Sequence, residues 1–175
     1  MFAPAALIRR RGGGGTMRTS QLRFIRQQGF SARVSDERLY TALMFQPRIV
    51  ASVAIIGVCF QNAWVFLGLS SLLWWSALAP ARNVFDAIYN VVVATPRGLP
   101  RLGPAPSPRR FAMGMAATIT FVIGSALLLD MSTTAWILEG IFIAAVASVV
   151  LGRFCVGSYL FDLLRLSPSQ CDFAA

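Results

Sequence analysis

Two side chains in this sequence have types and positions that could support chemistry, and the first is the carboxyl group of Glu139. It is the only acid inside the long apolar segments, and an ionisable group in such a place is by default a functional candidate. One hypothesis is a proton or cation relay in a small transporter. The other is a neutral or water-reached carboxyl group, hydrogen-bonded to a neighbouring helix. We favour the second, because a relay needs a second ionisable member.

The second candidate is the thiol of Cys155, in the stretch RFCVGSYLF. A thiol close to Arg153 at a membrane interface could be reactive, which would make the chain a membrane thiol protein. The alternative, a small apolar packing residue, is favoured. Cys59, Cys155 and Cys171 are far apart and form no C-x-x-C or zinc-like spacing, so we expect free thiols and no metal site.

Composition removes several other chemistries from the 175-residue chain. It has no histidine, the commonest general base and metal ligand, and all 16 basic residues are arginine, which excludes lysine chemistry. Hydrophobic residues make up 56% and charged residues 13%, about half the charged share of a soluble domain. We expect a membrane protein that is not an enzyme and ligates no cofactor. Its small-molecule contacts would be lipids or neighbouring pigments.

The apolar segments predict an all-α membrane protein with four transmembrane helices arranged as two tandem hairpins. Residues 49–81 carry no charge, and one helix of that length would span about 50 Å, against a hydrocarbon core of about 30 Å. We divide the run at Gln61-Asn62, because asparagine favours turns. Pro47 should then lie at the first helical position, and Ser107 should cap the third span. The expected spans are about residues 47–61, 63–79, 109–129 and 135–151 of a domain at 35–166, with a Pro-rich loop at 95–110 and a turn at 130–134.

The distribution of arginine predicts the orientation of these spans. Nine arginines precede or begin the first span, five lie between Arg82 and Arg110, and two follow the last span. The positive-inside rule then places both termini on the cytoplasmic side, and this accounts for the net charge of +9 better than nucleic-acid binding does. We expect a bacterial inner membrane. A mitochondrial inner membrane is the alternative, because the first 35 residues are arginine-rich and acid-free.

Segments outside the spans are expected at the membrane surface. Residues 1–34 form a basic arm, and residues 16–28 within it could be an amphipathic helix on anionic headgroups, where each arginine contributes about 1 kcal/mol. The segment NVFDAIYNVVVA is expected to be an interfacial helix with Asp86 and Tyr89 near the headgroups. Residues 167–175 form a tail. The arginines expected on the membrane surface are Arg9, Arg10, Arg11, Arg18, Arg23 and Arg26.

Two stripes of small residues are expected to hold the spans together. Helices in lipid pack through small side chains that allow close backbone approach, and residues four apart share a helix face. We expect the two stripes to meet each other, or one of them to meet a partner subunit. The stripes are Ala112, Ala116, Thr120 and Gly124 in the third span, and Gly140, Ala144, Ser148 and Gly152 in the fourth.

Two short motifs resemble those of a bacterial membrane-protein family that is catalogued as a domain of unknown function. The family looks like four hydrophobic segments with an opening Pro-Arg-Phe-Ala motif and a closing Arg-Phe-Cys-x-Gly-Cys motif. The resemblance covers about residues 45–166 and departs from the family at Ser158, where the second cysteine would stand. A C-x-x-S pair cannot close a disulfide, so the resemblance supports topology and implies no activity. The matching residues are Pro108, Arg110, Phe111 and Ala112, and Arg153, Phe154, Cys155 and Gly157.

Together these features predict a non-catalytic accessory subunit of a respiratory or photosynthetic membrane complex. Its partners would be membrane lipids and larger integral membrane subunits, with no nucleic acid. The alternatives are the transporter that uses Glu139 and the thiol protein that uses Cys155.

Overall fold

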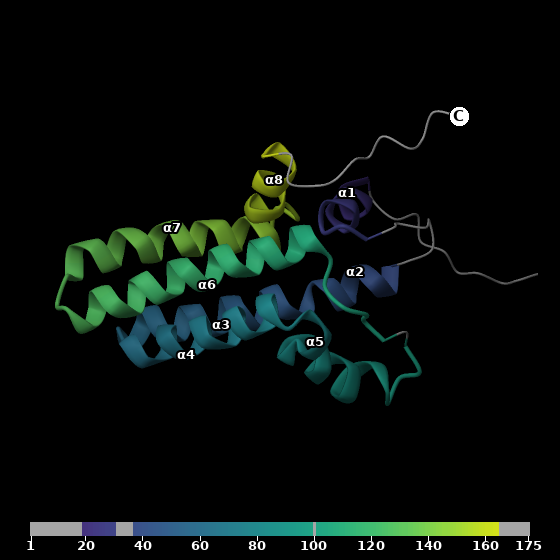
Figure 1. The fold of residues 1–175 in the computed structure, drawn as a ribbon, viewed down its shortest axis with the longest axis horizontal. Helices are drawn as coiled ribbons and strands as arrows, with labels where there is room; N and C mark the ends of the chain where they lie inside the picture. The colour runs from purple at the N-terminus through teal and green to yellow at the C-terminus, as the bar shows by residue number, and fades with distance from the viewer. Residues whose placement is uncertain (1–18, 31–36, 100, 165–175) are drawn as a thin grey trace, which may run out of the picture.

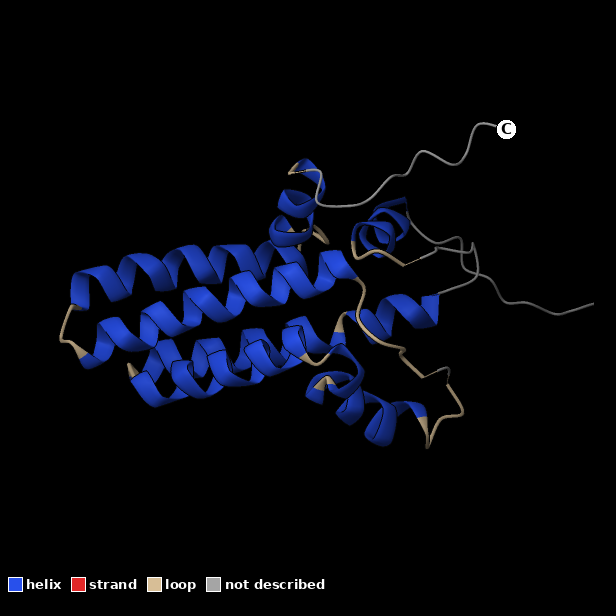
Figure 2. Ribbon diagram, viewed as in Figure 1, coloured by secondary structure: helices blue, strands red, loops and turns tan. Residues whose placement is uncertain are grey.

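The computed structural model describes residues 19–30, 37–99 and 101–164, and these residues fold into helices joined by turns and loops (Figures 1 and 2). Two of the helical segments are short: a 3-10 turn η1 at Pro80–Arg82 and a π-helical turn η2 at Asn90–Ala94. The α-helices are α1 (Thr19–Gln27), α2 (Glu37–Leu43), α3 (Phe45–Phe60), α4 (Ala63–Leu78), α5 (Val84–Tyr89), α6 (Ser107–Leu128), α7 (Ser132–Val150) and α8 (Val156–Leu163).

Helices α3, α4, α6 and α7 run side by side as an elongated bundle (Figure 1). At one end of the bundle lie the two tight turns, α3 to α4 and α6 to α7. We call this the turn end. At the other end α1, α2, α5 and α8 gather around the bundle, and we call this the capped end (Figure 1).

Within the described residues, three helical stretches are long and apolar enough to cross a membrane. They are Arg38–Phe60 with 23 residues, which joins most of α2 to α3, Ser107–Leu128 with 22 and Ser132–Val150 with 19. Helix α4, at 16 residues, is apolar but shorter. The expectation of an all-α chain with long apolar helices is confirmed, whereas the expected four spans in two tandem hairpins stay a prediction.

The turn at Gln61-Asn62 is where the sequence predicted it. Gln61 ends α3 in the left-handed conformation, with φ of 44°, and the Asn62 side chain accepts the backbone N–H of Trp64 at 2.9 Å to start α4. An N-cap of this kind satisfies a backbone donor that the helix cannot satisfy itself. The second turn is shorter than predicted, because α7 already begins at Ser132.

The structure corrects the expected position of Pro47 and the expected cap at Ser107. Pro47 is the third residue of α3, and only Met44 separates α3 from α2. Proline has no N–H to give to the carbonyl four residues earlier, so it interrupts a longer helix here where the sequence predicted a helix start. Ser107 is the first residue of α6, whose N-cap is Pro106 without a side-chain hydrogen bond.

One member of the small-residue stripe on α6, Gly124, lies against α4. A Cβ added to Gly124 would lie 2.8 Å from Leu67 Cγ and 3.1 Å from the Ala63 carbonyl oxygen. Nearby, Ser70 of α4 donates to the carbonyl oxygen of Ala117 at 2.8 Å. The close approach of α4 and α6 therefore depends on the missing side chain at Gly124.

The stripe of small residues on α7 is mostly exposed. Gly140, Ala144 and Gly152 are exposed, and no neighbouring atom lies within 4 Å of a Cβ added to Gly140. The two stripes therefore do not meet at Gly140. The alternative in the prediction, a partner subunit on this stripe, stays a prediction.

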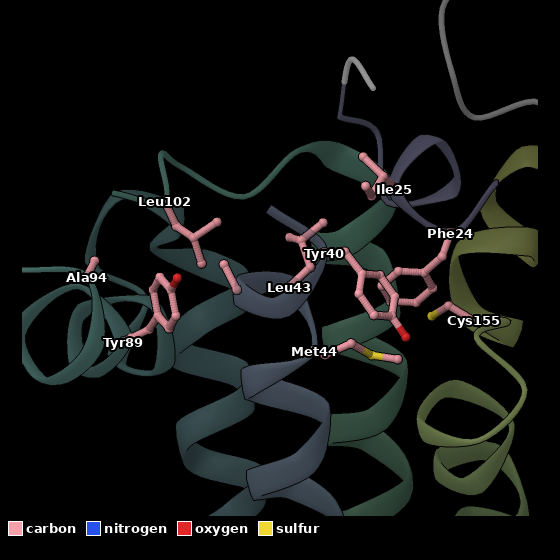
Figure 3. Packing of buried hydrophobic residues seen from close by; sticks show 10 residues of the cluster. Phe24, Ile25, Tyr40, Leu43, Met44, Tyr89, Ala94, Leu102 and Cys155 are labelled. Carbon is pink, nitrogen blue, oxygen red and sulfur yellow. The ribbon is translucent and has the colours of Figure 1, made fainter. Parts of the chain in front are cut away.

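Helix α1 covers the capped end with its apolar face (Figure 3). Phe24 and Ile25 are fully buried, and the Phe24 ring meets the Tyr40 ring edge-on with centroids 6.0 Å apart. This corrects the prediction that the helix in residues 16–28 lies on lipid headgroups with its apolar face, because that face packs against the protein. Arg23 and Arg26 are exposed, and their contact with headgroups stays a prediction. Arg9, Arg10, Arg11 and Arg18 lie outside the described residues.

We predict that Gly124→Ala destabilises the protein, whereas Gly140→Ala leaves it unchanged or slightly more stable. Alanine is favoured over glycine inside a helix by about 1 kcal/mol, but at Gly124 the added methyl group collides with α4. The thermal midpoints of both variants in detergent measure the difference. Equal midpoints would contradict the close contact between α4 and α6.

Candidate functional site: a polar cluster and a cavity at the capped end

A buried ion pair joins α5 to the start of α6. Arg109 Nη2 donates to Asp86 Oδ1 at 2.7 Å and Arg109 Nη1 donates to Asp86 Oδ2 at 3.2 Å, so the contact is bidentate. Both side chains are more than nine-tenths buried. Two parallel hydrogen bonds of this kind add geometric specificity to the charge attraction.

Two amide side chains extend the pair into a cluster. Gln46 of α3 accepts from Arg109 Nη2 through its Oε1 at 2.7 Å, and Asn83 donates to Asp86 Oδ2 at 2.9 Å. Asn83 also caps α5, because its Oδ1 accepts the backbone N–H of Phe85. The polar cluster of Gln46, Asn83, Asp86 and Arg109 therefore connects α3, α5 and α6.

This cluster was not predicted from the sequence, from which Asp86 and Tyr89 were expected near the headgroups. Both residues are buried, which corrects that prediction. A signal was present, since Asp86 is the only acid between Glu37 and Asp130 and lies in a region rich in arginine. A lone buried carboxylate requires a cation, but the sequence does not show which arginine supplies it.

Cys155 lies at the start of α8, where its backbone N–H and its carbonyl oxygen both bond to the side-chain amide of Gln27. The Gln27 side chain accepts the Cys155 N–H at 3.1 Å and donates to the Cys155 carbonyl oxygen at 2.9 Å. Gln28 donates to the hydroxyl of the fully buried Ser158 at 3.3 Å. Two consecutive glutamines at the end of α1 thus fix the C-V-G-S segment. Helix α8 itself was not predicted.

The two sequence motifs pack against each other. A Cβ added to Gly157 would lie 2.8 Å from the Ala112 Cα, so α8 crosses α6 at close backbone approach. Ser158 donates to the Pro108 carbonyl oxygen at 3.4 Å, and the rings of Phe111 and Phe161 lie 5.6 Å apart. The opening and closing motifs are therefore the two sides of one contact between helices.

The arginines of the two motifs, Arg110 and Arg153, make further contacts between helices. Arg110 donates through Nε to the carbonyl oxygen of Ala77, in the last turn of α4, at 2.9 Å. Arg153 donates to Ser20 of α1 at 3.1 Å and lies over the Tyr40 ring, 5.7 Å from its centroid. Both arginines therefore fasten the capped end and do not face Cys155 as free cations.

An open pocket with a volume of about 110 Å³ lies between the polar cluster and Cys155. Its polar lining consists of Gln28, Gln46, Arg109 and Cys155, and the rest of its wall is apolar. The structure therefore brings Cys155, a predicted candidate, close to a cluster that the sequence did not reveal.

Glu139 lies toward the turn end, far along α7 from this pocket. Its side chain is 1% exposed, and Gln61 Nε2 donates to its Oε2 at 2.9 Å. Its Oε1 has no hydrogen-bond partner within the described part of the chain. Gln61 also donates to the Val58 carbonyl oxygen, so Glu139 is tied to the end of α3. Glu139 and Cys155 do not form one site.

We predict that Asp86→Asn destabilises the protein by about 3–5 kcal/mol, because it leaves the Arg109 charge buried without a counter-charge. The double variant Asp86→Leu with Arg109→Met should recover most of this loss. Unfolding titrations in mixed detergent measure both variants. The single changes Asp86→Leu and Arg109→Met are measured in the same way, and if their effects add up to that of the double variant, the pair does not interact.

In a comparison with protein families, residues 41–165 match DUF4395, a domain of unknown function, and the match covers most of the chain. This confirms the expectation of a family catalogued as a domain of unknown function. Neither the curated proteins nor the solved structures gave a match. The match includes both motifs, the polar cluster, Cys155 and Glu139, and the chain therefore belongs to the DUF4395 family.

Proposed function

We propose that this chain is a non-catalytic subunit of a larger integral membrane assembly and that it acts by helix packing. The exposure of α7 supports the proposal most directly. In the most apolar 18-residue stretch of α7, only 17% is buried inside the protein. The corresponding share is 33% in Arg38–Phe60 and in Ser107–Leu128. The respiratory or photosynthetic setting of the assembly is the expectation from the sequence.

The occupant that suits the outer face of α7 is a transmembrane helix of a larger subunit. Gly140 and Ala144 are exposed one turn apart, so a neighbouring helix could approach the α7 backbone closely. The internal bonding of the polar cluster supports a structural role as well. Arg109 and Asp86 direct their hydrogen bonds to each other and to Gln46 and Asn83.

We further propose that α4 is a fourth span and that both termini are cytoplasmic in a bacterial inner membrane. Helix α4 has 16 residues, about 24 Å at the usual helical rise, but it lies along α6 for most of its length. The capped end carries exposed arginines, among them Arg23, Arg26, Arg82 and Arg101. A cytoplasmic surface with anionic lipids suits this charge.

The orientation predicts that a thiol placed in the turn end faces the outside. Met131→Cys, at an exposed position, should react with a membrane-impermeant thiol reagent added to whole cells. The background lacks the three native cysteines, and Arg101→Cys at the capped end is the control. Labelling of the control alone would reverse the proposed topology.

The assembly proposal predicts a defined stoichiometry with larger subunits. After extraction in mild detergent, native mass spectrometry should show the 19.0 kDa chain together with fixed amounts of such subunits. The double change Gly140→Leu with Ala144→Leu should remove them, because the larger side chains hold the partner helix away.

The matched control is Phe121→Leu, at an exposed position of α6. This variant should retain the partner subunits. The proposal is wrong if the unmodified chain arrives alone or only with copies of itself, or if the α7 variant keeps its partners as fully as the control does.

A further inference from the structure

An open groove lies between α4 and α6 toward the capped end of the bundle, and its volume is about 580 Å³. Trp74 and Ala77, near the end of α4, form one side of it. Residues between Ser107 and Ile119 of α6 form the other side, and they recur at the spacing of three and four that defines one helix face. Because Trp74 and Thr118 are exposed, the groove is open to the surroundings of the bundle.

The length and polarity of the groove match one leaflet of a bilayer. Arg110 and Ile119 both line it, and the rise along α6 from one to the other is about 14 Å. Half of a hydrocarbon core is about 15 Å thick. Beyond Arg110 the α6 wall is mostly apolar, and the hydroxyl group of Thr118 already donates to the Gly114 carbonyl oxygen at 2.9 Å. The groove therefore has one polar end, and the rest of its length suits an acyl chain.

Arg110 gives the polar end of the groove a positive charge without a counter-charge. Its Nε donates to the Ala77 carbonyl oxygen at 2.9 Å, which anchors the half-buried side chain to the last turn of α4. The only ion pair among the described residues joins Arg109 to Asp86, so no described carboxylate neutralises Arg110. The planar fork of a guanidinium group fits the oxygens of a phosphate group. Arg110 therefore suits a phosphate at this end of the groove.

The residues around the groove leave room for a lipid. Trp74 is 40% exposed, and tryptophan is enriched where membrane proteins meet the headgroup region. No neighbouring atom lies within 4 Å of a Cβ added to Gly114, so the groove is open over the α6 backbone at that residue. This contrasts with Gly124, where an added Cβ would collide with α4. Packing within the chain therefore leaves this stretch of α6 uncovered.

We propose that the groove binds an anionic phospholipid of the leaflet around the capped end. The lipid phosphate accepts hydrogen bonds from the terminal nitrogens of Arg110, and one acyl chain lies along the apolar wall of α6. A net negative headgroup is favoured over a zwitterionic one, because the capped end also exposes Arg23, Arg26 and Arg82. This inference rests on the proposed place of α4 in the membrane, but it does not depend on a partner subunit at α7.

The test measures contact between Trp74 and lipids with brominated acyl chains, because bromine quenches tryptophan fluorescence on contact. The full chain carries Trp64→Phe, Trp75→Phe and Trp136→Phe, which leaves Trp74 as the tryptophan. In phosphatidylcholine vesicles, an increasing fraction of the lipid is replaced by brominated phosphatidylglycerol, or by brominated phosphatidylcholine as the control. Half-maximal quenching should need a roughly fivefold lower fraction of the brominated phosphatidylglycerol, the effect of one arginine near anionic headgroups.

Two pairs of variants separate a defined site from diffuse attraction. Arg110→Gln should remove the roughly fivefold preference for phosphatidylglycerol. Its control, Arg82→Gln, removes the same charge from the exposed turn after α4 and should behave like the parent protein. Gly114→Phe should fill the groove and remove the preference as well, whereas Gly140→Phe adds the same ring on α7 and should keep it. Thermal midpoints show that each variant is folded.

The contradicting results separate this inference from the proposed membrane position. If neither brominated lipid quenches Trp74, α4 does not lie in the bilayer, and both this inference and the proposed fourth span fail. If both lipids quench equally, α4 lies in the bilayer, and only this inference is wrong.

The variants can overturn the inference independently. It is wrong if Arg82→Gln weakens the preference as much as Arg110→Gln does, or if folded Gly114→Phe keeps the preference in full. It is also wrong if inorganic phosphate at constant ionic strength abolishes the preference, because Arg110 then selects a free anion and not a lipid.

Discussion

The bidentate contact between Arg109 and Asp86 is the interaction on which the capped end depends. It lies where α3, α5 and α6 converge, and both partners are buried. A buried pair of this kind stabilises a fold little compared with well-packed apolar residues, but it is costly to break. We infer that its role is to select one arrangement of these helices. It also orients Gln46, whose side-chain oxygen accepts a hydrogen bond from Arg109.

The contact between α6 and α8 explains why the two motifs occur together in one chain. Gly157 permits α8 to touch the backbone of Ala112, and Ser158 bonds to the carbonyl group of Pro108. Helix α1 then fits over this contact through Gln27 and Gln28. The result is a layered cap in which Cys155 lies beneath an amphipathic helix that exposes its arginines. The pocket beside Cys155 and the exposed arginines of α1 therefore lie at the same end of the bundle.

The sequence was sufficient to predict features that depend on local physics. The length of the uncharged run and the turn preference of asparagine located the break at Gln61-Asn62, which the structure places at the predicted residues. Features that depend on a partner were not predictable in the same way. The apolar face of α1 suits lipid or protein equally, and only the fold shows that Phe24 and Ile25 face protein.

For the same reason, the neighbours of the candidate residues could not be predicted from the sequence. The stripes on α6 and α7 look alike in sequence, because a spacing of four defines a helix face and not its partner. In the structure Gly124 faces α4, whereas Gly140 faces outward. Asp86 and Arg109 are 23 residues apart, and no local pattern connects them. Cys155 was singled out from its sequence, but its neighbours in the pocket were not.

Amide hydrogen exchange of Asp86→Asn tests the central claim most directly. If the ion pair organises the capped end, exchange should become faster in α1, in α5 and around Cys155. The backbone near Gln61 and Met131, at the turn end, should keep the exchange rates of the parent protein. Unchanged exchange in the capped end, or an equal increase along the whole bundle, would contradict the account.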